Sequence, residues 1–406
     1  MPGLRTRMIA RDTSESHRVS SPLELLFDLT FVVAIAQIAV QLAHAIEAGH
    51  GLDKIGPYLM VFFAIWWAWM NFTWFASAYD TDDVPYRLLT LLQMGGVLVL
   101  AAGVPSAFSG DGYVAVTLGY LIMRIGLVSL WLRAAIQHPA GRTTALRYAA
   151  GISVVQALWV SRLALPEEWQ VWSFIVFALL DLSVPLWAER TGTTAWHPHH
   201  IAERYGLFVI ILLGESVLAS TVGVQQSLAT GISVDLVVIA VSGLVLLFTL
   251  WWLYFSEPAG EGLERNRDLS FLWGYGHFGI FAALAAIGSG LEVAVLSTVA
   301  ATDEAGEHHA LSASVVALAV ALPVAIFLLL LWLLHAPIVD RVVVRPVSIV
   351  IAAGAVLAVP FAADELGVAV SLEIIAGIVV LLLTVTLAEE SRRLHRVSPA
   401  RAAGPA

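Results

Sequence analysis

The chain has 406 residues, of which 59% are hydrophobic and 13% charged, and its formal net charge at pH 7 is −10. Soluble domains are about half apolar and a quarter charged, so this composition excludes an ordinary soluble protein and predicts a polytopic membrane protein. The absence of cysteine excludes disulfides, thiolate catalysis and cysteine-bound metals, and the lack of a basic domain argues against nucleic-acid binding.

The spans follow from the distribution of apolar residues. Residues 1–21 are polar, and no apolar core with a cleavage site precedes the first span, so we expect no cleavable signal peptide. After them come stretches of roughly 18–25 apolar residues, each long enough to cross about 30 Å of hydrocarbon as an α-helix. They predict an all-α fold with about twelve transmembrane helices, at 22–46, 55–77, 86–104, 113–136, 146–164, 169–188, 200–223, 232–256, 270–297, 312–335, 344–361 and 369–388.

The positive charges predict the orientation of these helices. Of the 21 Lys and Arg residues, Lys54 and Arg162 fall on one side of the predicted bundle and Arg124 lies within a span, while all the others fall on the opposite side. Loops rich in Lys and Arg normally stay in the cytoplasm. We therefore expect both termini to be cytoplasmic.

Similar segments recur in order along the chain, which suggests an internal duplication. Glu24 opens the first predicted helix and Glu203 the seventh, while Arg147 and Arg345 each open the fifth helix of a half. We therefore expect two parallel six-helix repeats, related by an axis along the membrane normal. The predicted parts are a cytoplasmic polar N-terminus (1–21), a first repeat (22–188), a cytoplasmic connector (189–199), a second repeat (200–388) and a basic cytoplasmic tail (389–406).

Two acids stand near the start of the first helix. Ser21, Pro22 and Glu24 have the pattern of a capping box, with serine as N-cap, proline first and glutamate third in the helix. Asp28 lies one turn deeper on the same face. Ionisable groups at bilayer depth cost about 2.5–3.5 kcal/mol each and normally face protein or water. Glu24 is therefore either a cap or part of an ion pathway, and Asp28 either lines that pathway or pairs with an arginine.

The seventh predicted helix carries a second group of polar residues. A histidine run at 197–200 precedes Glu203 and Arg204, and Glu215 follows near mid-membrane. Arg204 and Glu215 share a face but lie about 16 Å apart along the axis, too far to pair directly. Pro198 breaks the spacing of the run, which lies in a loop, so we expect a solvated or helix-capping histidine cluster and no metal site.

Pairing between buried charges is the alternative to an ion pathway. Arg124 in the fourth predicted helix requires an acid, and we expect Asp181 or Asp28. Glu215 either lines a pathway or pairs with Arg124 or His277. Glu292 in the ninth helix is a further candidate. The pathway candidates are Asp28, Glu215, Glu24, His277 and Glu203, and the ion-pair candidates are Arg124, Asp181 and Arg204.

Three stretches carry a family resemblance. They are HRVS at 17–20 with ELLFDLTFVVAIAQ at 24–37, HIAERYGLF at 200–208 with LGES at 213–216, and WGYGH at 273–277. In this order they closely resemble the motifs of the bacterial low temperature requirement protein A family. The resemblance implies a multispanning protein of the bacterial inner membrane, without an assigned biochemical activity.

The first helix has a second resemblance. Glu24, Phe27, Asp28 and Phe31 are spaced as in the first-helix segment of the endolysosomal potassium/proton channel family, which is built of six-helix repeats with this helix lining the pore. Here Phe27 replaces a serine of that family, and Leu207 stands where an aspartate would align in the second half. The resemblance implies a cation path along the first helix.

Together these observations predict a channel or transporter for a monovalent cation or a proton, in which Asp28 and Glu215 contact the ion with help from Glu24 and His277. No metalloprotease motif, phosphate loop or dinucleotide fingerprint occurs, so we predict neither an enzyme nor a cofactor. The expected partners are the lipid bilayer and further copies of the chain. The alternative is a non-transporting protein that senses or organises lipid or scaffolds partner subunits, with its buried acids in structural ion pairs.

Overall fold

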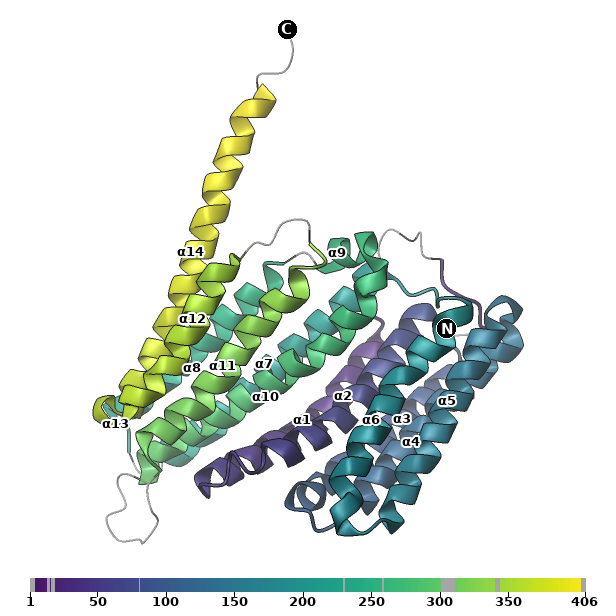
Figure 1. Cartoon of the computed structure of the whole chain (residues 1–406), viewed down its shortest axis with the longest axis horizontal. Helices are drawn as coiled ribbons and strands as arrows, with labels where there is room; N and C mark the ends of the chain where they lie inside the picture. The colour runs from purple at the N-terminus through teal and green to yellow at the C-terminus, as the bar shows by residue number, and fades with distance from the viewer. Residues whose placement is uncertain are drawn as a thin grey trace. The chain divides into compact units, whose positions relative to one another are not determined.

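The computed structural model describes residues 4–12, 15, 19–79, 81–228, 231–257, 259–300, 311–339 and 344–402. Every regular element in these ranges is a helix, which confirms the predicted all-α class (Figure 1). The chain divides into two compact units, Met1–Gln41 with Asp53–Phe208, and Leu42–Leu52 with Val209–Ala406. Their boundaries fall within α1 (Pro22–Glu47) and α7 (Pro198–Leu228). The six-helix duplication stays a prediction.

The first unit contains the beginnings of α1 and α7 and five further helices. In chain order α3 packs against α4, α4 against α5, and α5 against α6. The five helices are α2 (Ile55–Ala78), α3 (Val84–Ser109), α4 (Val114–Gln137), α5 (Arg142–Ser161) and α6 (Gln170–Ala188), with short 3-10 turns η1 (Pro139–Gly141), η2 (Arg162–Ala164), η3 (Glu167–Trp169) and η4 (Glu189–Thr191).

The core of the first unit is built on the aromatic side chains of α2. Trp66, Trp67 and Trp69 are at most 1% exposed, and Phe72 and Phe75 are fully buried. Large rings bury much apolar area per residue, and paired rings add about 0.5–1.5 kcal/mol beyond that area. α2 is thus the buried helix around which this unit packs.

Small residues set the distance between α3 and α4. A Cβ atom on Gly119 would overlap the backbone of Leu100 and lie 2.6 Å from the carbonyl oxygen of Gly96. Only glycine allows two helix backbones to approach this closely. This close approach explains why α3 and α4 have the most extensive contact of any two helices in the first unit.

The second unit is organised around α10 (Ser270–Ala300). α10 packs against α8 and α11, and α14 packs against α8, α11 and α12. The remaining elements are α8 (Val234–Phe255), α9 (Ala259–Arg265), η5 (Arg267–Leu269), α11 (Ala313–His335), α12 (Pro346–Ala358), η6 (Val359–Ala362), α13 (Ala363–Leu366) and α14 (Val368–Ala402).

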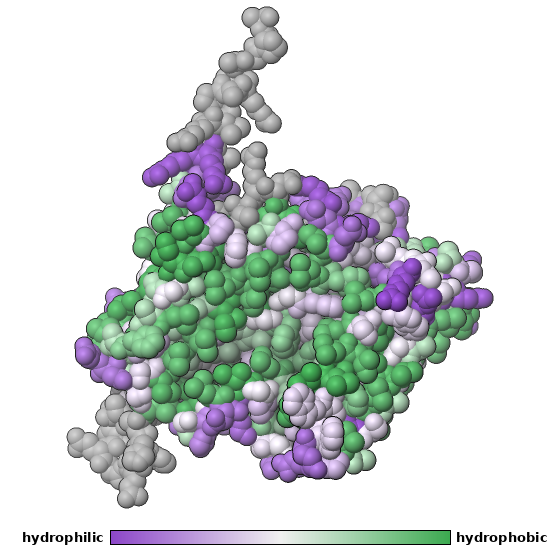
Figure 2. Space-filling model, in the orientation of Figure 1, coloured by the Kyte–Doolittle hydropathy of each residue, from purple (hydrophilic) through white to green (hydrophobic). Residues whose placement is uncertain are grey.

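Eleven helical segments of the described chain are long and apolar enough to cross a membrane. The predicted span at 146–164 is the helix α5, which is not among the eleven because its first turns are polar. Large apolar side chains cover the exposed helix faces, and Figure 2 shows hydrophobic residues over most of the visible surface, with hydrophilic residues gathered near helix ends. These features fit helices surrounded by lipid, so the polytopic membrane fold is confirmed.

Candidate functional site

The first turn of α1 folds as the sequence predicts. The backbone N–H of Ser21 donates to Oε2 of Glu24 at 2.8 Å, and the backbone N–H of Glu24 faces the Ser21 hydroxyl at 3.3 Å. These reciprocal contacts form the capping box and satisfy donors that a helix start leaves open. They use one carboxylate oxygen of Glu24 and leave Oε1 directed elsewhere.

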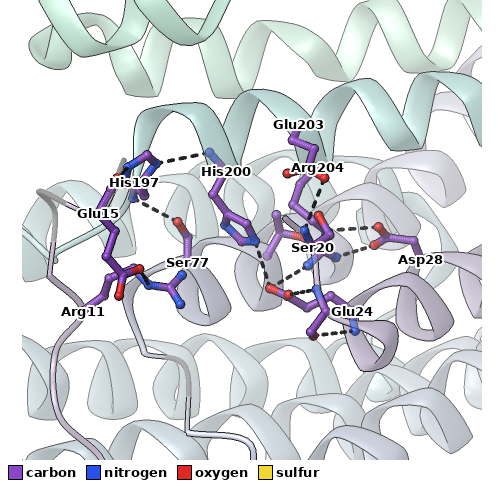
Figure 3. Close-up of polar contacts among 12 residues, drawn as sticks. Arg11, Glu15, Ser20, Glu24, Asp28, Ser77, His197, His200, Glu203 and Arg204 are labelled. Carbon is purple, nitrogen blue, oxygen red and sulfur yellow. Dashed lines mark hydrogen bonds and ion pairs between the residues drawn. The ribbon is translucent and has the colours of Figure 1, made fainter. Parts of the chain in front are cut away.

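Arg204 of α7 binds both acids of α1 (Figure 3). Its Nε donates to Oδ2 of Asp28 at 3.0 Å and its Nη2 donates to Oδ1, so the pair is bidentate. Its Nη1 lies 3.2 Å from Oε1 of Glu24. All three side chains are at most 1% exposed. The two acids therefore share one buried guanidinium.

Side chains of α2 complete the surroundings of Asp28. The indole N–H of Trp69 donates to Oδ1 of Asp28 at 2.7 Å, and Nη2 of Arg204 also lies 3.4 Å from the Thr73 hydroxyl. Asp28 thus accepts from three donors while fully buried, which is the condition under which a buried ion pair repays part of its desolvation cost. We call Glu24, Asp28, His200 and Arg204 the buried ion-pair cluster.

The histidine run contributes to this cluster. Nε2 of His200 lies 3.1 Å from Oε1 of Glu24. Nε2 of His197 faces the carbonyl oxygen of Glu15 at 2.8 Å and so carries the proton, which leaves Nδ1 to face the backbone N–H of His200 at 3.4 Å. The helix-capping role is therefore present. His197 and His200 are 4% and 0% exposed, so of the two alternatives that we considered the helix-capping one describes them and the solvated one does not.

Glu203 ties the same two helices together at their starts. Its Oε1 accepts from the backbone N–H of Ser20 at 3.2 Å, just before α1. Neighbouring residues of α7, Glu203 and Arg204, thus hold the chain entry and the first turns of α1. Among the described residues, no group of three or more His, Asp or Glu side chains is arranged to hold a metal ion.

A second buried charge network lies elsewhere in the first unit. Arg124 donates to the hydroxyl of Tyr120, and this hydroxyl donates to Oδ2 of Asp181 at 3.2 Å. The indole of Trp159 donates to the same Oδ2 at 2.8 Å. Of the two acids that we considered for Arg124, the structure places Asp181 next to it through Tyr120, and it places Asp28 with Arg204.

The acids of the second unit have different neighbours. Glu215 of α7 is half-buried, and Glu292 of α10 lies near Glu215 and near Glu47 at the end of α1, close enough for electrostatic repulsion. Oε2 of Glu292 is buried without a hydrogen-bond partner in the described part of the chain. Within the described ranges, the groups that act on Glu215 and Glu292 include no basic side chain. We call these three residues the acidic group.

His277, another predicted pathway residue, is fully buried in the second unit. Its Nδ1 lies 2.7 Å from the carbonyl oxygen of Trp273 and so carries the proton, and its Nε2 lies 3.1 Å from the hydroxyl of Tyr254. Both ring nitrogens therefore have partners other than Glu215. The ring of His335 stands 6.3 Å away between centroids.

Several residues of these sites were absent from the sequence-based candidates. Trp69 and Thr73 resemble ordinary packing residues of an apolar helix, and only the fold brings them to Asp28 and Arg204. Glu47 was not among the sequence-based candidates either. Its position at the end of a predicted span was the one available signal.

Comparison with known proteins gives a family and no activity. The family model of the bacterial low temperature requirement A protein (LtrA) matches residues 19–387. An uncharacterised protein of Rhizobium meliloti (strain 1021) is 27% identical over 296 residues, covering 69% of this chain and 70% of that protein. No solved structure matches.

Proposed function

We propose that this chain, which belongs to the bacterial low temperature requirement A (LtrA) protein family, moves a monovalent cation or a proton across the membrane through its second unit. The observation that carries the proposal is the acidic group: Oε2 of Glu292 is buried without a hydrogen-bond partner, Glu47 and Glu215 lie near it, and no basic group within the described residues offsets them. Eleven apolar helical segments provide the membrane-spanning frame.

The energetics of the acidic group favour a permeant ion. A carboxylate at the centre of a membrane helix costs about 2.5–3.5 kcal/mol on insertion scales and less towards the interface, and acids within spans mark ion and proton pathways when they face protein or water. Repulsion between Glu292 and its two acidic neighbours adds to that cost. A cation or a proton held between the carboxylates removes the repulsion, so this arrangement is stabilised by the species that it would carry.

The predicted topology gives these acids a place along the path. The positive charges put both termini and the starts of α1, α7 and α10 in the cytoplasm of a bacterium, with the protein in its plasma membrane. Glu215 then lies about 26 Å and Glu292 about 33 Å from the start of its helix, in the outer half of the bilayer. Acids there would raise the local cation concentration at the entrance.

The buried ion-pair cluster has a positioning role in this proposal. Asp28 and Glu24 were also expected to contact the ion, yet both are engaged by Arg204. Their charges hold the starts of α1 and α7, the two helices that carry Glu47 and Glu215 further along. The ion then meets Glu215 and Glu292, with Asp28 supporting the helix that leads to them.

A flux assay in proteoliposomes tests the proposal. We would measure K⁺, Na⁺ and H⁺ movement for the wild type, for Glu215→Gln/Glu292→Gln, and for Glu373→Gln, a control acid that is exposed on α14 of the same unit. We expect wild-type flux of at least one of these ions, a loss of about tenfold or more in the double variant, and wild-type flux in the control, because rings of acids set cation passage. Wild-type flux no greater than that of the double variant would contradict transport and favour the lipid-organising or scaffolding alternative.

A further inference from the structure

A cavity of about 200 Å³ lies within the first unit. Its walls come from the first turns of α2, the end of α3, the start of α4, the end of α5 and the first turns of α6. The lining is almost wholly apolar and aromatic, and the one charged side chain in it is Arg162 of η2. A cavity with apolar walls and a single charge is the usual form of a site for a small amphipathic ligand.

Arg162 is held in place but has no acidic partner in the described chain. Its Nε and Nη2 donate to the carbonyl oxygen of Gln170 at 3.2 and 2.9 Å. Its guanidinium lies over the ring of Tyr113, 4.5 Å from the centroid, and near those of Trp159 and Phe174. No carboxylate is among the groups that act on it, and it is 4% exposed.

This environment leaves a positive charge that the protein does not neutralise. Cation–π contacts and hydrogen bonds to a neutral carbonyl stabilise a charge but do not cancel it. Burying a guanidinium without a counter-ion is costly, and an anion in the cavity would remove that cost. The anion must also have an apolar part, because the rest of the cavity lining is almost wholly apolar.

We infer that this cavity binds a short-chain alkyl anion, with its charged head at Arg162 and its chain along Phe63 and Ala64 towards Tyr120. The volume is smaller than the roughly 300–1,000 Å³ typical of sites for drug-sized ligands, so the chain is short. The proposed site rests on residues of the first unit alone, and it is independent of the acids proposed to carry ions.

The floor of the cavity connects it to a buried charge network. Tyr120 and Trp159 line the cavity, and both donate hydrogen bonds to Asp181. Asp181 is in turn next to Arg124 through Tyr120. A ligand chain that reaches these two rings therefore contacts the side chains that hold Asp181.

Binding of octanoate to the full chain in nanodiscs tests the inference. The same measurement would use 1-octanol and octyltrimethylammonium, which share the chain length but are neutral and cationic. We expect octanoate to bind about tenfold more tightly than octanol, as one charge-assisted contact provides, and the ammonium ion to bind least. Arg162→Gln should remove the preference for octanoate over octanol, and Arg162→Lys should restore part of it.

A second pair of variants separates binding from general damage. Ala64→Phe fills the cavity and should abolish binding of both octanoate and octanol, while Ala102→Phe on an exposed face of α3 should change neither. 2-Bromooctanoate places its bromine beside the carboxylate, so it should quench the fluorescence of Trp159. The Trp159→Phe variant should lose the part of the quenching that comes from this tryptophan. Equal binding of octanoate and octanol to the wild type, or an unchanged preference in Arg162→Gln, overturns the inference.

Discussion

In the first unit Asp28 and Glu24 share the guanidinium of Arg204, whereas in the second unit Glu292 has Glu215 and Glu47 for its charged neighbours. The acids of the first unit are also the more deeply buried, yet each has a partner for its charge. Burial of an acid in this protein therefore does not by itself indicate transport. The informative feature is whether a basic group accompanies the carboxylate.

The largest expected effect comes from removing the shared guanidinium. We expect Arg204→Met to lower the free energy of unfolding by about 3–5 kcal/mol, because it leaves two carboxylates buried without compensation. Unfolding in detergent, followed by fluorescence, measures the loss. The matched control is Arg87→Met, whose partner Asp82 is exposed. Its cost should stay below about 1 kcal/mol. Equal costs for the two variants would show that the buried ion-pair cluster is not a stabilising contact.

A paired acid outside the spans should give a smaller, pH-dependent effect. Asp83, the N-cap of α3, is buried, which favours its neutral form, but donors from Arg133, Thr6 and Tyr86 outweigh burial and lower the pKa of Asp83 below its ordinary value. Its contribution to stability is therefore present above the unfolded pKa near 3.9 and is lost as the pH falls through the lower pKa of the folded state.

Asp83→Asn removes this charge and tests that sign. At neutral pH the variant's free energy of unfolding should be about 1 kcal/mol lower than that of the wild type, which is the difference between a charged and a neutral acceptor. This gap between the two proteins should close as the pH falls below about 4. Urea unfolding between pH 7 and pH 2 measures the gap. A gap that widens on acidification would mean that the folded state does not lower the pKa of Asp83.

The smallest effect should have the opposite sign. Glu292→Gln removes a carboxylate whose charged neighbours in the described part of the chain are acids, so we expect it to leave stability unchanged or raise it by less than about 1 kcal/mol. Asp28→Asn, which removes the negative charge that pairs with Arg204, should lower stability. Thermal unfolding of the two variants side by side checks the contrast. A loss in Glu292→Gln comparable to that in Asp28→Asn would end the distinction between the two units.

The helices and their starts could be predicted from the sequence because both depend on nearby residues. Apolar runs of membrane length predicted the spans. Ser21 and Glu24, which stand three residues apart, predicted the capping box. The partner of Arg124 was narrowed to two acids, since a buried arginine requires one.

The contacts between distant helices could not be predicted in the same way. Asp28 and Arg204 lie 176 residues apart in the chain, and periodicity within one helix carries no information on which distant helix faces it. The sequence therefore left an arginine partner open for Asp28 and made Arg204 an ion-pair candidate, but it could not join the two. The cavity at Arg162 was missed for the same reason, because its walls come from five helices.

The separation between Asp28 and Arg204 has a consequence for how the chain is made. At about 5–20 residues per second, synthesis needs on the order of 10–30 s to proceed from one residue to the other. During that interval the newly made α1 carries two acids whose partner Arg204 has not yet been synthesised. Cooling slows translation, so the interval in which both acids lack this partner lengthens at low temperature.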